Sequence, residues 1–271
     1  MTEMDKKAQV SIEKRSDKVA EHASMSYQPS LFPIEIVETY PSNQGSADLS
    51  LIGKGRDGKH YAIKTLSDNG GFVPASEFFC HHLARLVSIP TPSFEFVQLE
   101  HGEIAFGSVW EGGVSLVRTY PDMYKILQGD IVVEDLDTFL GKVYGFDLFV
   151  NNEDRHFGNY IFRESFNNTK IGLAFDFGRA WKETDPLGYE CLEPGCNTSI
   201  YNKIVRKEKR YDKFAANQVL EKIAAISKED IEVILSMMHD SWMTQTEKQV
   251  ILDWWGSTEF VERIEKLKGA I

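Results

Sequence analysis

Two aspartates and an asparagine lie on either side of a short apolar segment whose pattern indicates a β-hairpin. Residues 151–178 read NNEDRHFGNYIFRESFNNTKIGLAFDFG, with Asp154 and Asn159 before the segment and Asp176 after it. The Asn-Asn pair at 167–168 is typical of a turn. A hairpin would bring the two flanking loops side by side, so Asn159 and Asp176 could converge on one hard cation such as Mg²⁺. Asp154 would then be free to accept a hydroxyl proton.

This order of residues is the one that phosphoryl transfer of the protein-kinase type uses. A base aspartate is followed five residues later by an asparagine, and an Asp-Phe-Gly triplet supplies the metal-binding aspartate. The reaction needs them because it depends on positioning the hydroxyl and neutralising phosphate charge. A given triplet occurs by chance in about 3% of chains of this length, so only its coupling to the upstream pair makes it specific. The alternative is a cluster of polar turn residues that caps the hairpin.

A lysine and a glutamate in the preceding part of the chain fit the same chemistry. In HYAIKTL, period-2 alternation puts Ala62, Lys64 and Leu66 on one face of a strand, so the lysine can reach the α- and β-phosphates of a nucleotide. Glu77 stands on the next helix and is the expected partner, because a charged lysine on an apolar strand is costly unless it is paired. The alternative is a surface lysine on an edge strand.

The loop that would cover the phosphates is less distinctive. YPSNQGSADLSLIGKG contains Gly45 between Ser42 and Ser46 but no repeated glycine pattern. Its backbone N–H groups could surround phosphates, or the segment could be an ordinary polar turn.

The elements that must position these residues divide the chain into three parts. Residues 1–30 are polar and are expected to form an arm, residues 31–112 an N-lobe that binds the nucleotide phosphates, and residues 113–271 a helical C-lobe. The N-lobe pattern is mostly strands, with turns at Asp57-Gly58 and His101-Gly102 and one helix, PASEFFCHHLARLVS.

Helical patterns dominate after a Gly-Gly hinge at 112–113. VEDLDTFLGKVYGFDLFVNN predicts an apolar helix that leads into the candidate loops, and three helical patterns are expected in the last 60 residues. Ser227 with Asp230, and Thr244 with Glu247, are capping-box signals. We therefore expect an α+β fold of the two-lobed protein-kinase type, with a small β-rich N-lobe carrying one helix and a larger helical C-lobe.

Composition restricts the partners. The net charge of −11 disfavours direct nucleic-acid binding, and the absence of a run of 18 apolar residues predicts that the chain does not span a membrane. Three cysteines are too few and odd in number for a disulfide framework, and the N-terminus lacks a secretory signal, so a cytoplasmic location is expected.

The motif resembles the HipA-type bacterial serine/threonine kinases, which share an N-x-D-R-H-x-x-N order with phosphoinositide kinases. That order reads here Asn152, Asp154, Arg155, His156 and Asn159, and AFDFG follows. The segments IPTPSFEFV and FGSVWEGG are also similar to this family, and the resemblance covers roughly residues 35–240.

The resemblance implies roles for individual residues. Asp154 would be the catalytic base, and Asn159 and Asp176 the Mg²⁺ ligands. ATP would be bound by Lys64, supported by Glu77, and by the hinge residues Val109, Trp110 and Glu111 beside the adenine. His156, also assigned to the nucleotide site, would either carry a proton or hydrogen-bond the backbone near Asp176 and stiffen the loop.

The resemblance also implies substrates and partners. Members of the family are toxins of toxin–antitoxin pairs that phosphorylate translation factors, and some phosphorylate a serine of their own phosphate loop; Ser42 or Ser46 is the candidate here. Full-length members carry an extra N-terminal subdomain that 30 polar residues cannot supply, so an antitoxin or a small separate protein is an expected partner.

Two other functions stay open at this point. A lipid kinase shares the Asp-Arg-His motif, although the segment after Asp-Phe-Gly is not basic enough for an anionic membrane surface. A non-catalytic nucleotide-binding module is the third hypothesis, although the complete set of catalytic residues argues against it.

Overall fold

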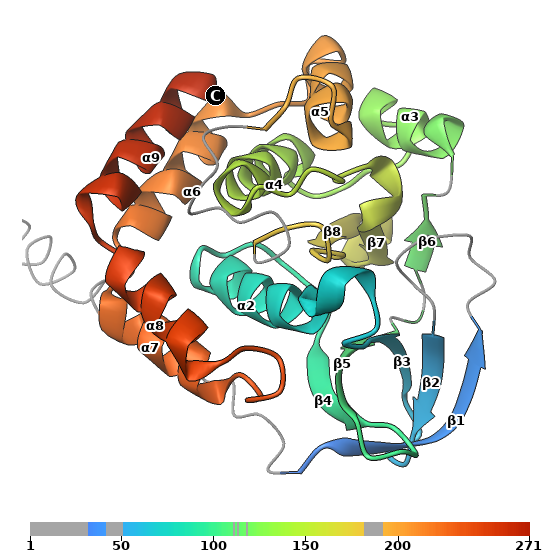
Figure 1. The fold of residues 1–271 in the computed structure, drawn as a ribbon. Helices are drawn as coiled ribbons and strands as arrows, with labels where there is room; N and C mark the ends of the chain where they lie inside the picture. Colours follow the sequence, from blue (N-terminus) through green and yellow to red (C-terminus); the bar gives the residue numbers. More distant parts are fainter. Residues whose placement is uncertain (1–31, 42–50, 111, 113, 118, 182–191) are drawn as a thin grey trace, which may run out of the picture. The chain divides into compact units, whose positions relative to one another are not determined.

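The computed structural model describes residues 32–41, 51–110, 112, 114–117, 119–181 and 192–271 (Figure 1). The predicted N-terminal arm, the phosphate loop around Gly45 and the second glycine of the expected hinge lie outside the described residues.

Strands from the first part of the described chain close into a barrel (Figure 1). Neighbouring strands pair antiparallel around the ring, except β1 and β4, whose parallel pairing closes it. The strands are β1 (Ile34–Pro41), β2 (Leu51–Gly55), β3 (His60–Lys64), β4 (Phe94–Gln98) and β5 (Ile104–Val109). The sequence predicted these segments as strands but did not predict their closure.

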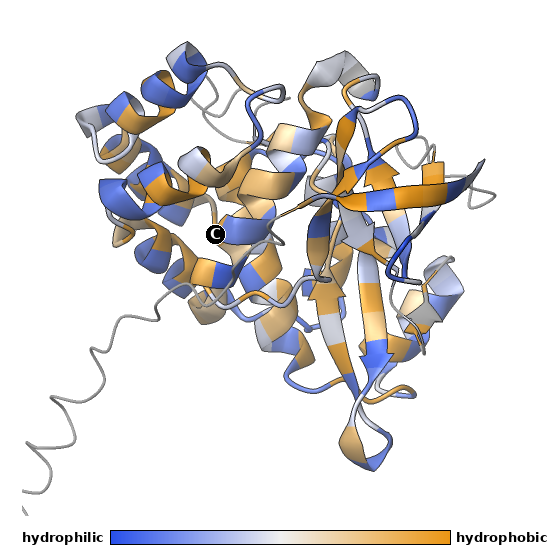
Figure 2. Ribbon diagram, turned by 90° about the horizontal axis from the view of Figure 1, so that it is seen from below, coloured by the Kyte–Doolittle hydropathy of each residue, from blue (hydrophilic) through white to orange (hydrophobic). Residues whose placement is uncertain are grey.

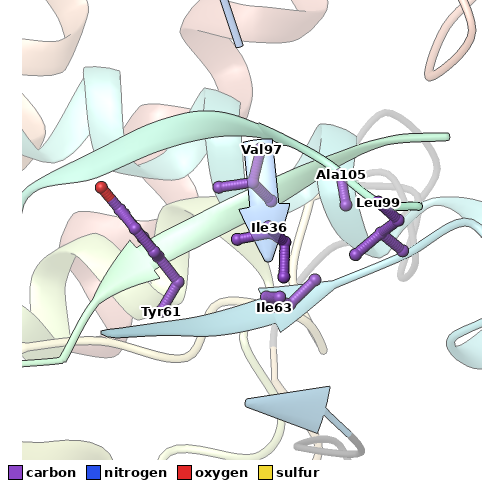
Figure 3. Packing of buried hydrophobic residues seen from close by; sticks show 6 residues of the cluster. All are labelled: Ile36, Tyr61, Ile63, Val97, Leu99 and Ala105. Carbon is purple, nitrogen blue, oxygen red and sulfur yellow. The ribbon is translucent and has the colours of Figure 1, made fainter. Parts of the chain in front are cut away.

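The two hairpins of the barrel form where the sequence places flexible turn residues. Gly58 lies between β2 and β3 with a φ of 83°, and Gly102 lies between β4 and β5 with a φ of 86°. Residues that have a Cβ atom rarely adopt this backbone conformation. The alternating inward side chains of the strands pack inside the barrel, as Figure 3 shows for six residues: Ile36, Tyr61, Ile63, Val97, Leu99 and Ala105.

Helix α2 (Val73–Leu86) is buried along almost its whole length. Phe78 packs against Phe94 and Phe96 of β4, and Phe79 stacks on Trp181 with ring centres 4.1 Å apart. The helix begins with Pro74 in its first turn, where the missing N–H is tolerated. Glu77 is therefore carried by a helix that its apolar neighbours hold in place.

The hairpin predicted around the candidate catalytic residues is present. Strands β7 (Tyr160–Glu164) and β8 (Lys170–Ala174) pair antiparallel, and β6 (Val114–Leu116) pairs with β7 to complete a three-stranded sheet. Asn167 and Asn168 at the turn both have a φ of 58°. Asparagine tolerates this left-handed conformation better than most residues.

The remainder of the described chain is mainly helical. Four helices, not the three expected, follow residue 212, because Gly256 and Ser257 break the last apolar pattern in two. Both predicted capping boxes are confirmed. The helices are α3 (Tyr120–Gln128), α4 (Leu136–Val150), α5 (Asn197–Lys207), α6 (Lys213–Ala224), α7 (Lys228–Met237), α8 (Gln245–Trp254) and α9 (Thr258–Ala270).

The predicted mixture of strands and helices is confirmed, and its division into two lobes stays a prediction. Most helices carry both hydrophobic and hydrophilic residues (Figure 2), as expected of helices that bury one face. Of the helices that the structure describes, none combines the length and the apolar character that a membrane crossing would need.

Candidate active site

The loop that carries Asp154 is fixed to the end of α4 by a buried aspartate. Asp147, in the last turn of α4, is fully buried. Its carboxylate accepts hydrogen bonds from Asn152 Nδ2 at 2.8 Å and from Arg155 Nε and Nη2 at 2.9 and 3.1 Å. Asn151, the residue directly after α4, has a left-handed φ of 53°, which turns the chain back toward the helix. The Asn152 and Arg155 of the motif therefore hold the loop in shape.

Arg155 also joins the two loops at the ends of the hairpin. Its Nη1 donates to the carbonyl of Asn159 at 3.1 Å and to the carbonyl of Phe175. The guanidinium carbon lies 4.8 Å from the centre of the Phe177 ring. Burial opposes the charge of Arg155, but the carboxylate of Asp147 outweighs burial and raises the pKa of the guanidinium above its ordinary value. A permanent buried cation thus connects the loop of Asp154 to the loop of Asp176.

Asp154 and Asn159 lie within one short hydrogen-bonded turn. The side chain of Asn159 donates from Nδ2 to the backbone carbonyl of Asp154 at 2.9 Å, and Asn152 Oδ1 accepts from the Asp154 N–H at 3.2 Å. This leaves Oδ1 of Asn159 as the side-chain atom available to a cation. The motif spacing of five residues is what permits this contact.

Asp176 and Lys64 form a buried ion pair between residues far apart in the chain. Lys64 Nζ lies 3.3 Å from Asp176 Oδ1, and the two side chains are 7% and 15% exposed. Burial alone would raise the pKa of Asp176, but the ammonium of Lys64, with a smaller contribution from Arg155, holds it below the ordinary value. Asp176 is therefore ionised and can bind a cation. Its φ of 61° is left-handed, an uncommon conformation for a residue with a side chain.

Glu77 contacts the segment that follows Asp176. Its Oε1 accepts a hydrogen bond from the Phe177 N–H at 3.0 Å, and its Oε2 lies 3.5 Å from His81 Nδ1. Burial raises the pKa of Glu77 to about 8, although the positive charge of Lys64 acts to lower it. The sequence expected Glu77 to pair with Lys64, and that pairing stays a prediction; the structure shows Glu77 fixing the backbone next to Asp176.

The backbone contact of His156 differs from the one expected, while its place in the nucleotide site and its role as a proton carrier stay predictions. His156 does hydrogen-bond the backbone, but its Nδ1 accepts from the N–H of Gly158 at 3.0 Å and not from the chain beside Asp176. The reason is local: His156 is the N-cap of a single 3₁₀ turn, Phe157–Asn159, and caps it with its ring.

The structure describes only some of the remaining predicted site residues. Val109 and Trp110 lie at the end of β5, where the Trp110 N–H donates to the His60 carbonyl at 2.8 Å. Their contact with adenine stays a prediction. Glu111, Ser42 and Ser46 lie outside the described residues.

Two residues that the sequence did not indicate also belong to the site. Asn197 Nδ2 donates to Asp154 Oδ1, and the hydroxyl of Thr198 contacts the backbone of Asn152 and Arg155. Both stand at the start of α5, more than 40 residues after the loop. They carry no motif, and only the tertiary fold brings them there.

The side chains available fit a magnesium ion bound together with a nucleotide. Asn159 and Asp176 offer an amide oxygen and a carboxylate, the hard ligands that Mg²⁺ prefers. Within the described ranges, no group of three or more His, Cys, Asp or Glu side chains could hold a metal ion. Mg²⁺ is usually bound by one or two protein ligands together with phosphate oxygens and water, which matches this limited set.

Comparison with known proteins finds one matching family and similar folds among solved structures. The profile of the family described as HipA-like kinase matches residues 34–265. The crystal structure of the Helicobacter pylori proinflammatory kinase CtkA is similar in fold, with a TM-score of 0.52, 14% identity, and coverage of 81% of this chain and 93% of that chain.

A second solved structure, Shewanella oneidensis MR-1 HipA with HipB and operator DNA, has a TM-score of 0.46 and 12% identity, and covers 96% of this chain and 71% of that chain. No curated protein matches significantly. Because the family profile covers most of its length, the chain belongs to the HipA-like kinase family.

Proposed function

We propose that the protein is a Mg²⁺-ATP-dependent serine/threonine kinase that transfers the γ-phosphate to a protein hydroxyl. The observation that carries this proposal is the joining of Asp154, Asn159 and Asp176 by Arg155, which hydrogen-bonds the backbone at Asn159 and Phe175. Membership of the HipA-like kinases supports kinase activity.

Each residue has one task in the proposed reaction. Lys64 binds the α- and β-phosphates, and Glu77 keeps Phe177, and with it the Asp176 loop, in position. Asn159 and Asp176 would hold Mg²⁺, which would neutralise charge on the phosphate oxygens. The ion pair between Lys64 and Asp176 already brings the phosphate-binding and metal-binding groups together, at 3.3 Å.

Asp154 orients the acceptor and takes its proton. The acceptor O–H gives its proton to the Asp154 carboxylate while the oxygen bonds to the γ-phosphorus. The bond from that phosphorus to the bridging β–γ oxygen breaks, and ADP leaves with the electron pair. No oxidant or further reactant is needed.

The acceptor and the biological setting rest on the family resemblance. We propose a protein substrate of the translation-factor class, a role as the toxin of a toxin–antitoxin pair in the cytoplasm, and autophosphorylation at Ser42 or Ser46. The partner would be an antitoxin or a small protein that resembles the N-terminal subdomain of the family. The N-lobe of residues 31–112 would bind the nucleotide and the C-lobe of residues 113–271 would carry the catalytic loops.

Labelled phosphate transfer identifies the acceptor class. The protein is incubated with γ-labelled ATP and Mg²⁺, alone, with a cell extract, and with phosphoinositide vesicles, and products are mapped by peptide mass. Label on protein serine or threonine supports the proposal, provided that Asp154→Asn and Asp176→Asn remove it. Label on lipid alone contradicts the protein-kinase assignment. Absence of transfer to any acceptor, in the presence of measurable ATP binding, contradicts the catalytic reading.

A further inference from the structure

The candidate base, Asp154, is held by a residue outside the catalytic motif. Asn197, the first residue of α5, donates from Nδ2 to Asp154 Oδ1. Among the described parts of the chain, no other side chain donates a hydrogen bond to this carboxylate. One oxygen is therefore fixed by Asn197, and Oδ2 is left to receive the proton of an acceptor.

The neighbouring residue ties α5 to the backbone of the same loop. Thr198 is 2% exposed. Its Oγ1 accepts from the Arg155 N–H at 2.9 Å and donates to the Asn152 carbonyl, and its own N–H donates to the Glu153 carbonyl at 3.2 Å. These contacts fix the start of α5 against the loop, so the Asn197 amide reaches Asp154 from a supported position.

The backbone of Glu153 contacts both ends of the stretch that follows Asp-Phe-Gly. Its N–H donates to the Arg179 carbonyl at 3.3 Å, and its carbonyl accepts from the Thr198 N–H. Residues 179 and 198 are thus both fixed at one position of the catalytic loop.

We propose that Asn197 is a positioning residue for Asp154, held by Thr198, and that it selects the orientation of the carboxylate from which proton transfer occurs. The proposal rests on the proposed kinase function. An Asp side chain turns readily about its terminal bond, and a donor on one oxygen removes that freedom. Positioning of a reacting group matters because a displacement of about 1 Å can lower a rate about 100-fold.

The alternative is that Asn197 is only a polar residue in the first turn of a helix. In that case its removal would leave turnover unchanged or would lower stability in parallel with activity. The two roles therefore differ in which kinetic constant they affect.

Kinetics of Asn197 variants distinguish them. Asn197→Ala is expected to lower kcat by about 10- to 100-fold with KM for ATP changed less than about twofold, because the lost donor acts on the base and not on the nucleotide. Asn197→Asp keeps the shape but replaces the donor by a like charge, so its kcat should fall at least as far. Asn197→Gln retains a donor and should recover part of the rate. Asn217→Ala, on α6, is the matched control.

The kinetic results distinguish failure of the positioning role of Asn197 from failure of the proposed kinase function. An active wild type whose Asn197→Ala variant keeps full kcat, or loses melting temperature and ATP affinity together with kcat, overturns the positioning role and leaves the kinase assignment intact. An inactive wild type that binds ATP overturns the proposed function and the inference with it. Loss of kcat alone, with partial recovery in Asn197→Gln, supports the inference.

Discussion

Arg155 is the residue through which the candidate site is assembled. Its guanidinium reaches Asp147 on α4 and the carbonyls of Asn159 and Phe175 at the two ends of the hairpin. Arginine suits this position because one planar group can donate in several fixed directions and keeps its charge when buried. The Asp-Arg-His order of the motif is thus explained in part by structure, since Arg155 builds the loop that Asp154 occupies.

Lys64→Met tests the phosphate-binding role. We expect ATP affinity to fall by about 10- to 100-fold, since hydrogen bonds to charged groups contribute about 1.5–3 kcal/mol. The measurement is calorimetric titration with Mg²⁺-ATP. Lys59→Met is the control, because Lys59 lies near β3 with its side chain 56% exposed. Equal affinities for wild type and Lys64→Met would remove Lys64 from the site.

We expect the free energy of unfolding to depend on pH because His81 is buried. Burial lowers its pKa from 6.5 to about 4, so between these values the unfolded chain is protonated at His81 while the folded chain is not. The free energy of unfolding must therefore fall as the pH falls from 6.5 to 4, by up to about 3 kcal/mol from this residue.

Urea unfolding at several pH values tests this. His81→Gln should flatten the acid side of the stability curve, and His101→Gln, a histidine substitution at an exposed position, is the control. An unchanged slope in His81→Gln would mean that His81 is not held neutral. The slope is compared and not the absolute stability, because Gln does not reproduce the contact of His81 with the Glu77 carbonyl at 2.9 Å.

Among the helices, strands and turns, the sequence predicted correctly those features that depend on residues close together in the chain. Glycines and asparagines at the turns, alternating strands and the capping boxes at Ser227 and Thr244 all depend on neighbours within a few residues. The break at Gly256 was missed, because the apolar pattern continues from α8 into α9. Asn197 was missed for another reason: its partner lies 43 residues away, and no periodicity links them.

The contact between α4 and α6 depends on glycines. A Cβ at Gly145 would lie 2.4 Å from the Ala216 carbonyl oxygen, and one at Gly141 would lie 2.3 Å from that of Asp212. The close approach leaves no space for a side chain. Because α4 carries Asp147 and leads into the loop of Asp154, this contact helps to determine where that loop begins.

Gly145→Ala should destabilise the protein by about 1–3 kcal/mol, although alanine is the better helix former, because backbone must move to admit the methyl group. Gly269→Ala is the matched helical control, since nothing lies within 4 Å of its added Cβ. It should be neutral or stabilise by up to about 1 kcal/mol. Chemical denaturation of both variants measures the difference, and a neutral Gly145→Ala would show that the helices can separate at little cost.

At the scale of the molecule, contacts between distant segments determine the arrangement. The barrel closes through Ile34 with Val97 and Glu35 with Gln98, and the site joins Lys64 of β3 to Asp176 beyond β8. Trp242, after α7, donates from Nε1 to the Ile104 carbonyl of β5 at 2.9 Å. Strand patterns cannot predict a parallel pairing over such a separation. The contact of Lys64 with Asp176 was not predicted either, since the sequence offered only Glu77 as the partner of Lys64.

We propose that Asp154 serves as the base in transfer of the γ-phosphate of a nucleotide held by Lys64 and the Asp176 loop. The most direct measurement compares wild type, Asp154→Asn and the exposed-site control Asp130→Asn for Mg²⁺-ATP affinity and for phosphate transfer to protein. We expect Asp154→Asn to bind ATP within about threefold of wild type but to transfer phosphate at least about 100-fold more slowly, and Asp130→Asn to match wild type in both properties. Transfer by Asp154→Asn at the wild-type rate would contradict this proposal.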